Sequence, residues 1–209
     1  MSKRCLIVCA YAETPLKGLI KEREGDFIVC ADGGYAIALR EGLKPDLLIG
    51  DLDSLPPGEE PECETLRLQP EKDDTDTMAC VKYALEHGFE EIVILGGIGG
   101  RLDQTFANLQ TLGYCLSQGV RATLMDGRNR AFLIRDETIE LKAEKGFKFS
   151  VFAWSDRAEG VSEENAKYHL DHYSMVSANP IGVSNEFLQN SARISVENGV
   201  LLVVLSKDP

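Results

Sequence analysis

Paired metal-binding cysteines are absent from this 209-residue sequence, and histidine is scarce. None of the six cysteines forms a Cys-x-x-Cys pair, and the three histidines have no cysteine partner at the spacing of a zinc site. Most cysteines lie inside apolar runs, which is typical of reduced, buried thiols in a cytosolic protein. No Ser/His/Asp or Cys/His arrangement for nucleophilic catalysis is recognisable.

Long hydrophobic runs are also missing, so no segment reaches the length of a transmembrane helix. The apolar run near the N-terminus, 5–10, is followed closely by Glu13 and Pro15. A first buried strand accounts for this run better than a signal peptide does. We therefore expect a cytoplasmic protein with no membrane partner.

Basic side chains are in short supply. Lys and Arg number 22 against 34 Asp and Glu, which gives a formal net charge of −12. A protein that binds the phosphate backbone of a nucleic acid needs a basic face, so this composition argues against a nucleic acid polymer as partner. A single nucleotide is not excluded, because a bound metal ion can offset local carboxylates.

The first two-thirds of the chain alternates short apolar runs with helical patterns. The helical patterns occupy 35–42, 75–87 and 103–118, and each stops at or near a glycine. Short apolar runs of the kind expected for strands covered on both faces lie at 5–10, 27–31, 47–50, 65–68, 92–96 and 122–125. This alternation predicts an α/β domain with a mostly parallel, Rossmann-like sheet.

The pattern changes after 126–130. The segments 146–154 and 192–206 alternate with period two, and no long helical pattern follows residue 130. Asn198-Gly199 separates two alternating runs, which predicts a β-hairpin at that point. We expect two domains: the α/β domain at 1–127 and a smaller antiparallel β-domain at 128–209.

Polar clusters follow four of the predicted strands. Ligands of open α/β sheets bind in the crevice at the carboxyl ends of the strands. The clusters are ADGG at 31–34, GDLDS at 50–54, KDDTD at 72–76 and GGIGGRLD at 96–103. Because all four would share one edge of the sheet, we interpret them as one site.

Asp51 and Asp53 lie two positions apart after a predicted strand. In a continuing strand both side chains would share a face, and both could bind one Mg²⁺, which prefers carboxylate oxygens and keeps waters for phosphates to replace. The alternative is that both cap a turn, and for this pair alone the two interpretations weigh equally. Asp76, with Asp73 and Asp74 nearby, favours the ion, because converging carboxylates repel each other without a cation.

The segment 72–77 also has a structural explanation. Asp74 or Thr75 is a good N-cap, and an acidic residue in a first helical turn complements the macrodipole. This explanation does not account for Lys72, which directly precedes the acids and is expected to face the same edge.

The segment GGIGGRLDQ, 96–104, is neither a Walker A loop nor a convincing dinucleotide fingerprint. Its glycines would let backbone N–H groups approach an anion at the start of a helix, and Arg101 adds a forked donor for phosphate oxygens. Asp103 is either a helix cap, which its position favours, or a group that orients a substrate hydroxyl.

Taken in order, these motifs resemble those of the bacterial thiamin pyrophosphokinase family. The family pattern is ADGG, G-D-x-D-S, K-D-x-T-D and G-G-x-x-G-R-x-D-[H/Q]-x-x-A-N, and its last part corresponds to GGIGGRLDQTFAN at 96–108. Later family signatures, Lys-[Tyr/Trp]-x-Leu and Ser-Asn-Glu-Phe, correspond to KYHL at 167–170 and SNEF at 184–187. The resemblance runs nearly end to end.

The resemblance implies an α/β domain that binds ATP and Mg²⁺, followed by a β-sandwich that binds thiamin. The implied reaction moves the pyrophosphoryl group of ATP to the hydroxyl of thiamin and yields thiamin diphosphate and AMP. The resemblance further implies a homodimer, with thiamin bound where the α/β domain of one subunit meets the β-domain of the other.

The resemblance also implies roles for individual residues. Arg101 and Lys72 would bind the triphosphate, and Asp103 would align or deprotonate the thiamin hydroxyl. The implied metal ligands are Asp51, Asp53 and Asp76, of which the last two count among the catalytic residues with Arg101 and Asp103. The other implied contacts with nucleotide or thiamin are Asp32, Gly33, Gly34, Asp73, Thr75, Gly99, Gly100, Gln104, Tyr168, Ser184 and Asn185.

Two positions differ from the commonest family residues. Gln104 stands where many bacterial members have histidine, so we assign it at most a positioning role. Tyr168 stands where tryptophan is the familiar alternative. Its ring would still stack on the vitamin's pyrimidine, worth ~1 kcal/mol, and packing within the β-domain core is an equally weighted alternative.

Other functions are compatible with parts of the sequence. A pyrophosphokinase for another alcohol, such as a pterin carbinol, would share the front motifs, whereas the KYHL and SNEF segments favour thiamin. A non-catalytic nucleotide or thiamin sensor would be expected to lack a metal ligand or Arg101, and each of these positions is filled. A Mg²⁺-dependent phosphohydrolase would need an aspartyl nucleophile motif or a histidine cluster, and neither is visible.

Overall fold

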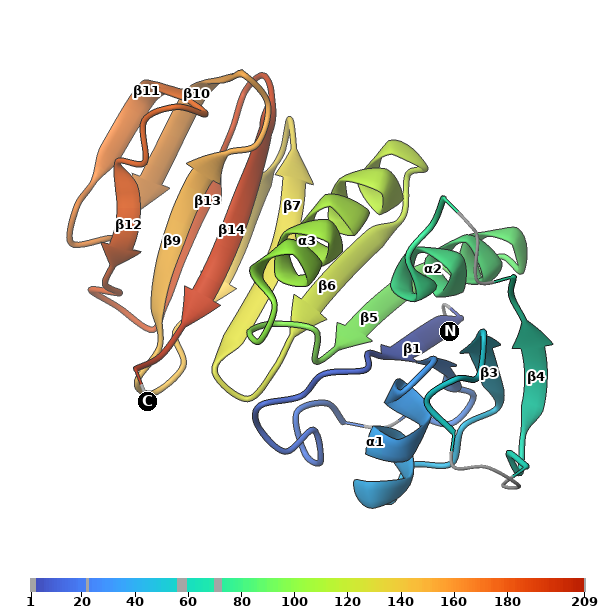
Figure 1. Ribbon diagram of the computed structural model, residues 1–209. Coiled ribbons are helices and arrows are strands. Elements are labelled where there is room, and N and C mark those ends of the chain that lie inside the picture. Colours follow the sequence, from blue (N-terminus) through green and yellow to red (C-terminus); the bar gives the residue numbers. More distant parts are fainter. Residues whose placement is uncertain (1–2, 22, 56–59, 70–72, 209) are drawn as a thin grey trace. The chain divides into compact units, whose positions relative to one another are not determined.

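The computed structural model describes residues 3–21, 23–55, 60–69 and 73–208. The chain forms two compact units, Met1–Gly127 and Arg128–Pro209 (Figure 1). None of the helices in the described ranges has the length and apolar composition that crossing a membrane requires.

The first unit is built on a parallel sheet with the strand order β6-β5-β1-β2-β3-β4. Its strands are β1 Arg4–Val8, β2 Phe27–Ala31, β3 Leu47–Gly50, β4 Glu64–Arg67, β5 Glu91–Leu95 and β6 Arg121–Met125. The chain adds β2, β3 and β4 on one side of β1 and then returns to place β5 on the other side. The carboxyl ends of β1 and β5 therefore form a topological switch point, where α/β proteins bind their ligands.

Three helices connect these strands: α1 Gly34–Arg40, α2 Asp76–Glu86 and α3 Leu102–Ser117 (Figure 1). Tyr35, Ile37 and Ala38 of α1 pack on the sheet face that carries Leu6 and Val8 of β1. The alternate residues of β1 point to the other face and are fully buried too. Both faces of the sheet are thus covered around β1, which explains why its sequence is a continuous apolar run.

Each helix stops where the sequence predicts. A glycine with positive φ follows two residues after the last helical residue, at Gly42, Gly88 and Gly119. These are the left-handed positions that end a helix at little steric cost when the residue is glycine. At the other end of α2, Thr75 accepts a hydrogen bond from the Met78 N–H (3.1 Å) and is the N-cap.

One strand prediction is wrong in its burial. The apolar run 65–68 predicted a strand covered on both faces, but all four residues of β4 are exposed. The reason is that β4 lies at the edge of the sheet and pairs on one side with β3. Edge strands lack the helix cover and second neighbour that a central strand has.

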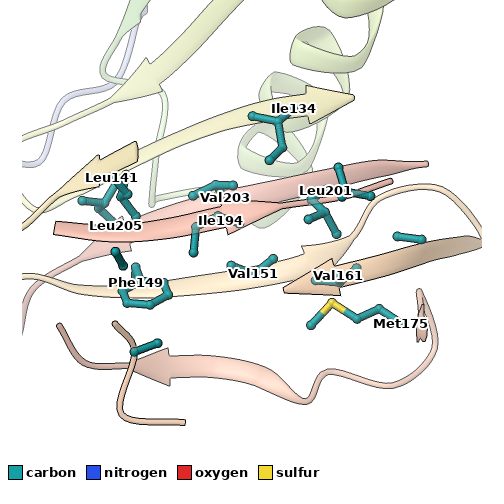
Figure 2. Close-up of a cluster of buried hydrophobic side chains, with 14 residues drawn as sticks. Ile134, Leu141, Phe149, Val151, Val161, Met175, Ile194, Leu201, Val203 and Leu205 are labelled. Carbon is teal, nitrogen blue, oxygen red and sulfur yellow. The ribbon is translucent and has the colours of Figure 1, made fainter. Parts of the chain in front are cut away.

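The second unit is a sandwich of two antiparallel sheets and contains no helix within residues 128–208. One sheet has the order β12-β9-β14-β7 and the other the order β11-β10-β13-β8. Its strands are β7 Asn129–Arg135, β8 Thr138–Lys142, β9 Lys148–Ala153, β10 Arg157–Glu164, β11 Leu170–Val176, β12 Gly182–Asn185, β13 Ser191–Ser195 and β14 Val200–Ser206. Figure 2 shows the core between the sheets, where Phe149 and Val203 of one sheet meet Val161 and Ile194 of the other. The predicted fold class, an α/β domain followed by an antiparallel β-sandwich, is confirmed.

The predicted hairpin at Asn198-Gly199 is wrong. The strands on either side of it belong to different sheets, because β13 pairs with β8 and β10 while β14 pairs with β7 and β9. The backbone amides at the turn bond to segments other than the flanking strands: Asn198 N–H donates to the Glu159 carbonyl of β10 (3.2 Å), and Gly199 N–H donates to Asp136 Oδ1 (2.7 Å). The turn carries the chain from one sheet of the sandwich to the other, where β14 takes its place between β7 and β9.

Candidate active site

A pocket of about 170 Å³ opens at the switch point of the first unit. Its walls come from the segments that follow β1, β2 and β5 and from the N-termini of α2 and α3. The lining residues are Cys9, Ala10, Tyr11, Ala31, Thr75, Asp76, Thr77, Gly97, Gln104 and Asn108. The predicted site edge and the pocket therefore coincide, and Thr75, Asp76 and Gln104 are predicted site residues that the pocket brings together.

Three carboxylates converge beside this pocket. Asp32 follows β2, and Asp51 and Asp53 follow β3; one oxygen from each lies within 4.8 Å of the other two. Because β2 and β3 are neighbours in the sheet, their carboxyl ends bring these residues together. Oxygen donors of this kind suit Mg²⁺, and the open side would leave coordination positions for water or phosphate.

The way in which Asp51 and Asp53 converge differs from the prediction. The strand does not continue past Gly50, and Leu52 has a positive φ of 70°. The chain turns so that Asp53 N–H donates to Asp51 Oδ1 (3.2 Å). The third member of the group is Asp32, whereas Asp76, the third predicted metal ligand, lines the adjoining pocket.

Asp32 is held in an unusual backbone conformation, with φ 43°. Its N–H donates to the Ile49 carbonyl (2.8 Å), its carbonyl accepts from Tyr35 N–H (3.0 Å), and its Oδ2 accepts a hydrogen bond from the Ser54 hydroxyl. Left-handed conformations in residues with a Cβ cost free energy and persist where surrounding contacts impose them. The acid is therefore positioned by β3 and the loop after it.

The glycines of the ADGG motif have a packing role in this structure. A Cβ on Gly34 would lie 2.0 Å from the Val8 carbonyl oxygen, so only glycine lets α1 start so close to β1. Gly33 is the N-cap residue of α1 and, being glycine, has no side chain that could cap the helix. These positions bring Asp32 to the edge of the crevice.

The glycine-rich loop after β5 uses several of its backbone amides internally. Gly97 N–H donates to the Tyr11 carbonyl (2.7 Å), and Gly99 N–H donates to Thr105 Oγ1 (3.0 Å). The buried Asn108 side chain donates to the Gly97 carbonyl (2.9 Å). Gly100 lies against the Tyr11 ring, which a Cβ would approach to 2.9 Å. The glycines thus allow the loop to lie tightly on the segment after β1.

Arg101 and Asp103 form an exposed, two-pronged ion pair at the start of α3. Arg101 Nε donates to Asp103 Oδ1 (3.1 Å) and Nη2 donates to Oδ2 (2.6 Å). The Arg101 hydrogen bonds hold the pKa of Asp103 below its ordinary value, and the same pairing raises the pKa of Arg101. Asp103 Oδ1 also accepts from Gln104 N–H (2.9 Å), so it bonds an amide of the first helical turn.

The other acids of 72–76 are placed around the N-terminus of α2. The Asp74 carboxylate forms an ion pair with Lys82 of α2, with Oδ2 2.5 Å from Nζ. Asp73 is exposed. Asp76 lies in the first turn of α2. Lys72 lies outside the described residues.

Tyr11 and Asn108 are pocket residues that were not assigned from the sequence. Asn108 stands inside the quoted motif GGIGGRLDQTFAN, so its place there was a usable signal. Tyr11 had no such signal beyond following the first strand at the predicted edge.

Cys9 and Thr77 also line the pocket, and Cys9 Sγ lies 3.5 Å from Thr77 Oγ1. Burial raises the pKa of Cys9 to about 11, so its thiol stays protonated at neutral pH.

In the second unit, Tyr168 is 61% exposed. The alternative that this ring packs in the β-sandwich core is therefore wrong. Lys167 Nζ lies 5.6 Å from the ring centroid, and a pocket of about 80 Å³ adjoins the residue. Ser184 is exposed with φ 57°, and its N–H donates to Ser150 Oγ (3.0 Å).

Asn185 differs from its neighbours because its side chain is only 3% exposed. Its Oδ1 accepts from Tyr168 N–H (2.9 Å) and its Nδ2 donates to the Tyr168 carbonyl (2.8 Å). The predicted ligand contact at Asn185 is thus accompanied by an internal role: the side chain holds the backbone of Tyr168.

Comparisons with known proteins agree with both units. A family model described as "Thiamin pyrophosphokinase, catalytic domain" matches residues 21–124, and one described as "Thiamin pyrophosphokinase, vitamin B1 binding domain" matches residues 136–201. The thiamine pyrophosphokinase of Bacillus subtilis is 25% identical over 85% of this chain and 86% of its own length. Thiamin pyrophosphokinase 1 of Caenorhabditis elegans is 26% identical over 75% of this chain and 72% of its own.

Solved structures agree with the fold. The Bacillus subtilis thiamine pyrophosphokinase crystal structure superimposes with a TM-score of 0.88 at 23% identity, covering 99% of this chain and 100% of that one. A thiamin pyrophosphokinase family protein from Enterococcus faecalis gives a TM-score of 0.85 at 28% identity with the same coverage. With both units matched by models of one family, and with its motifs placed at one sheet edge, the chain belongs to the thiamin pyrophosphokinase family.

Proposed function

We propose that this protein transfers the pyrophosphoryl group of ATP to the hydroxyl of thiamin and releases AMP, with Mg²⁺ bound in the first unit. The observation that carries the proposal is the convergence of Asp32, Asp51 and Asp53 beside the switch-point pocket. Membership in the family supplies the two substrates.

The bond changes are those of an in-line displacement. The thiamin hydroxyl oxygen forms a bond to the β-phosphorus of ATP, the bond from that phosphorus to the α–β bridging oxygen breaks, and AMP leaves with that oxygen. The hydroxyl proton passes to a base in the site or to solvent. Such a reaction depends on positioning and on charge stabilisation, with little covalent chemistry from the protein.

The three carboxylates would hold Mg²⁺, which supplies neutralisation of negative charge on the transferred group. Asp76 lies in the adjoining pocket and would contact the same ion complex through water or directly. The residues present suit such an ion, because they offer carboxylate oxygens from two loops without a competing cationic side chain in the group.

Arg101 and Asp103 would act on the phosphates and the hydroxyl. The two side chains bind each other in this structure. Binding of the triphosphate would therefore replace the Asp103 carboxylate by phosphate oxygens as the partner of Arg101. Asp103, whose pKa is lowered by Arg101, is a weak proton acceptor and suits orientation of the hydroxyl better than its deprotonation.

The second unit would bind the vitamin through Tyr168 and Ser184. The exposed ring of Tyr168 offers a face for stacking. Further apolar side chains, Ile181, Val183 and Leu188, are exposed on the following segment. We infer that a second copy of the chain covers this region in a homodimer. The cytoplasm suits the protein, since its six cysteines are free thiols.

The test is to incubate the purified protein with ATP, Mg²⁺ and thiamin and to resolve the nucleotide product by chromatography. AMP and thiamin diphosphate are expected in equal amounts. ADP as the product would reject pyrophosphoryl transfer. Turnover with a pterin alcohol and none with thiamin would reject thiamin as the substrate.

A variant pair tests the metal assignment. Asp53→Asn should lower turnover by roughly 100-fold or more while the protein stays folded. Asp171→Asn, an exposed acid of β11 in the second unit, is the control and should leave turnover unchanged. Normal turnover in Asp53→Asn would show that Asp53 is not a metal ligand.

A further inference from the structure

Glu163 of β10 is a fully buried carboxylate that no motif of the family accounts for, with 0% of the residue exposed. Its Oε2 accepts a hydrogen bond from Asn185 Nδ2 (2.6 Å), while its Oε1 has no hydrogen-bond partner among the described residues. Burying a carboxyl group with one oxygen unpaired costs free energy. A group of this kind in a folded protein calls for an explanation.

The hydrogen bonds of Asn185 give that explanation. The Oδ1 atom accepts from the N–H groups of Tyr168 and Glu186 (2.9 and 3.0 Å), and Nδ2 donates to the Tyr168 carbonyl and to Glu163 (2.8 and 2.6 Å). The amide therefore uses two acceptor sites and two donor hydrogens. Glu163 supplies the acceptor for the second hydrogen and so adds to the backbone contacts that fix which way the amide faces.

The orientation of this amide decides where Tyr168 lies. The segments around Tyr168 and Asn185 run side by side, joined by Lys167 N–H to the Glu186 carbonyl (3.0 Å) and Leu188 N–H to the Asn165 carbonyl (2.9 Å). At Tyr168 the backbone pairing is replaced by the Asn185 side chain, which binds both the N–H and the carbonyl. An amide turned the other way would place its oxygen against the Tyr168 carbonyl and its NH₂ against the Tyr168 N–H.

We propose that Glu163 is a positioning residue for the vitamin site: through Asn185 it fixes the backbone of Tyr168 and the end of β12, which carries Ser184. Glu163 does not touch the substrate in this arrangement. The inference rests on the proposed function, in which Tyr168 and Ser184 contact thiamin. It adds that thiamin binding depends on an acceptor at residue 163.

The electrostatics of Glu163 agree with this arrangement. Burial raises its pKa to about 7, and the hydrogen bond from Asn185 and the nearby His169 act in the opposite direction. His169 also contacts the same strand, with Nδ1 2.8 Å from the Glu163 carbonyl oxygen. Whether ionised or neutral, the carboxyl keeps an oxygen that can accept from Asn185.

The experiment compares steady-state kinetics of four full-length variants with the unchanged protein. Glu163→Met keeps the volume and removes the acceptor, Glu163→Asp keeps the charge and shortens the reach, and Glu163→Gln keeps an acceptor at the same distance. Glu164→Gln is the matched control, because Glu164 is the exposed neighbour in the same strand. Thermal melting establishes that each variant is folded.

We expect Glu163→Met to raise KM for thiamin roughly tenfold, Glu163→Asp to raise it by less, and Glu163→Gln and Glu164→Gln to leave it near the original value. The KM for ATP and kcat should change little in all four variants. A folded Glu163→Met with an unchanged KM for thiamin, or with equal losses in both KM values and kcat, would overturn the proposal.

If Glu163→Met does not fold, the other two substitutions decide. A raised thiamin KM in Glu163→Asp with a normal one in Glu163→Gln supports the proposal, and any other combination overturns it. Failure of the proposed function is a separate result, because it would appear in the unchanged protein as an absence of turnover with thiamin.

Discussion

Gly50 lies so close to Asp32 that a Cβ atom at residue 50 would be 2.9 Å from the Asp32 Cβ and Oδ1 atoms. The last residue of β3 is therefore shaped to receive the acid that follows β2. Gly50→Ala should displace Asp32 from the other two carboxylates and lower turnover by roughly 100-fold, as small misplacements in active sites do. The measurement is AMP formation with saturating ATP and thiamin.

The control for this substitution is Gly119→Ala. Gly119 has φ 76° with no atom within 4 Å of an added Cβ, so alanine there strains the backbone far from the site. It should lose about 1 kcal/mol of stability and keep normal turnover. Normal activity in Gly50→Ala would mean that Asp32 is not needed where the structure places it.

The carboxylate group predicts which acid completes the metal site. If the three acids hold Mg²⁺ as proposed, Asp32→Asn should raise the Mg²⁺ concentration needed for half-maximal activity, because one of three charged ligands would be replaced by a neutral one. The shift should be roughly tenfold and partly compensated by excess Mg²⁺. Activity measured against Mg²⁺ concentration at constant free ATP checks this. An unchanged Mg²⁺ dependence would assign Asp32 to the nucleotide instead.

The ion pair between Arg101 and Asp103 predicts opposite effects on binding and turnover. Asp103→Asn removes the charge that competes with phosphate for Arg101, so ATP should bind roughly 3-fold more tightly; the effect is small because the pair is exposed. Turnover should fall, because in the proposed mechanism the thiamin hydroxyl would lose the carboxylate that orients it. Calorimetry of Mg²⁺-ATP binding and the turnover assay check the two halves separately, and weaker ATP binding would contradict the first.

The raised pKa of Glu163 predicts a pH dependence of stability. The folded protein holds this proton up to about pH 7, compared with an ordinary value of 4.5, so the folded state binds more protons between these values. The stabilising contribution is fully present below pH 4.5 and is lost as pH rises through 7. Between pH 5 and pH 8 the free energy of unfolding should fall by about 2 kcal/mol more in the unchanged protein than in Glu163→Gln.

Urea unfolding at both pH values, followed by circular dichroism, measures this difference. Glu164→Gln should retain the pH dependence, since its carboxyl is exposed. Equal pH dependence in the unchanged protein and Glu163→Gln would show that Glu163 titrates near its ordinary value.

Much of the first unit could be predicted because its signals are local. Strands such as 47–50 are continuous apolar runs, and helices end at glycines such as Gly88 and Gly119 that the sequence displays. The edge of the sheet that carries the site followed from the alternation of strands and helices alone. The sequence also indicated that Asp51 and Asp53 lie at that edge.

The remaining features depend on contacts between distant residues. Asp32 meets Asp51 because β2 and β3 are neighbours, and strand order is not written in either motif. The Asn198-Gly199 signal is local and was overridden by the sandwich core, which needs β14 between β7 and β9. Alternation from the buried Val161 places Glu163 on the core face of β10, but nothing near it in sequence points to Asn185.

The position of β14 has a consequence for synthesis of the protein. This strand follows the other strands of the second unit along the chain and lies in the middle of its sheet, in register with β7 on one side and β9 on the other. Until residues 200–206 have been synthesised, β7 and β9 therefore lack the neighbour that they share. The α/β unit, by contrast, has all its strands by residue 125, so its sheet can form before β14 has been synthesised.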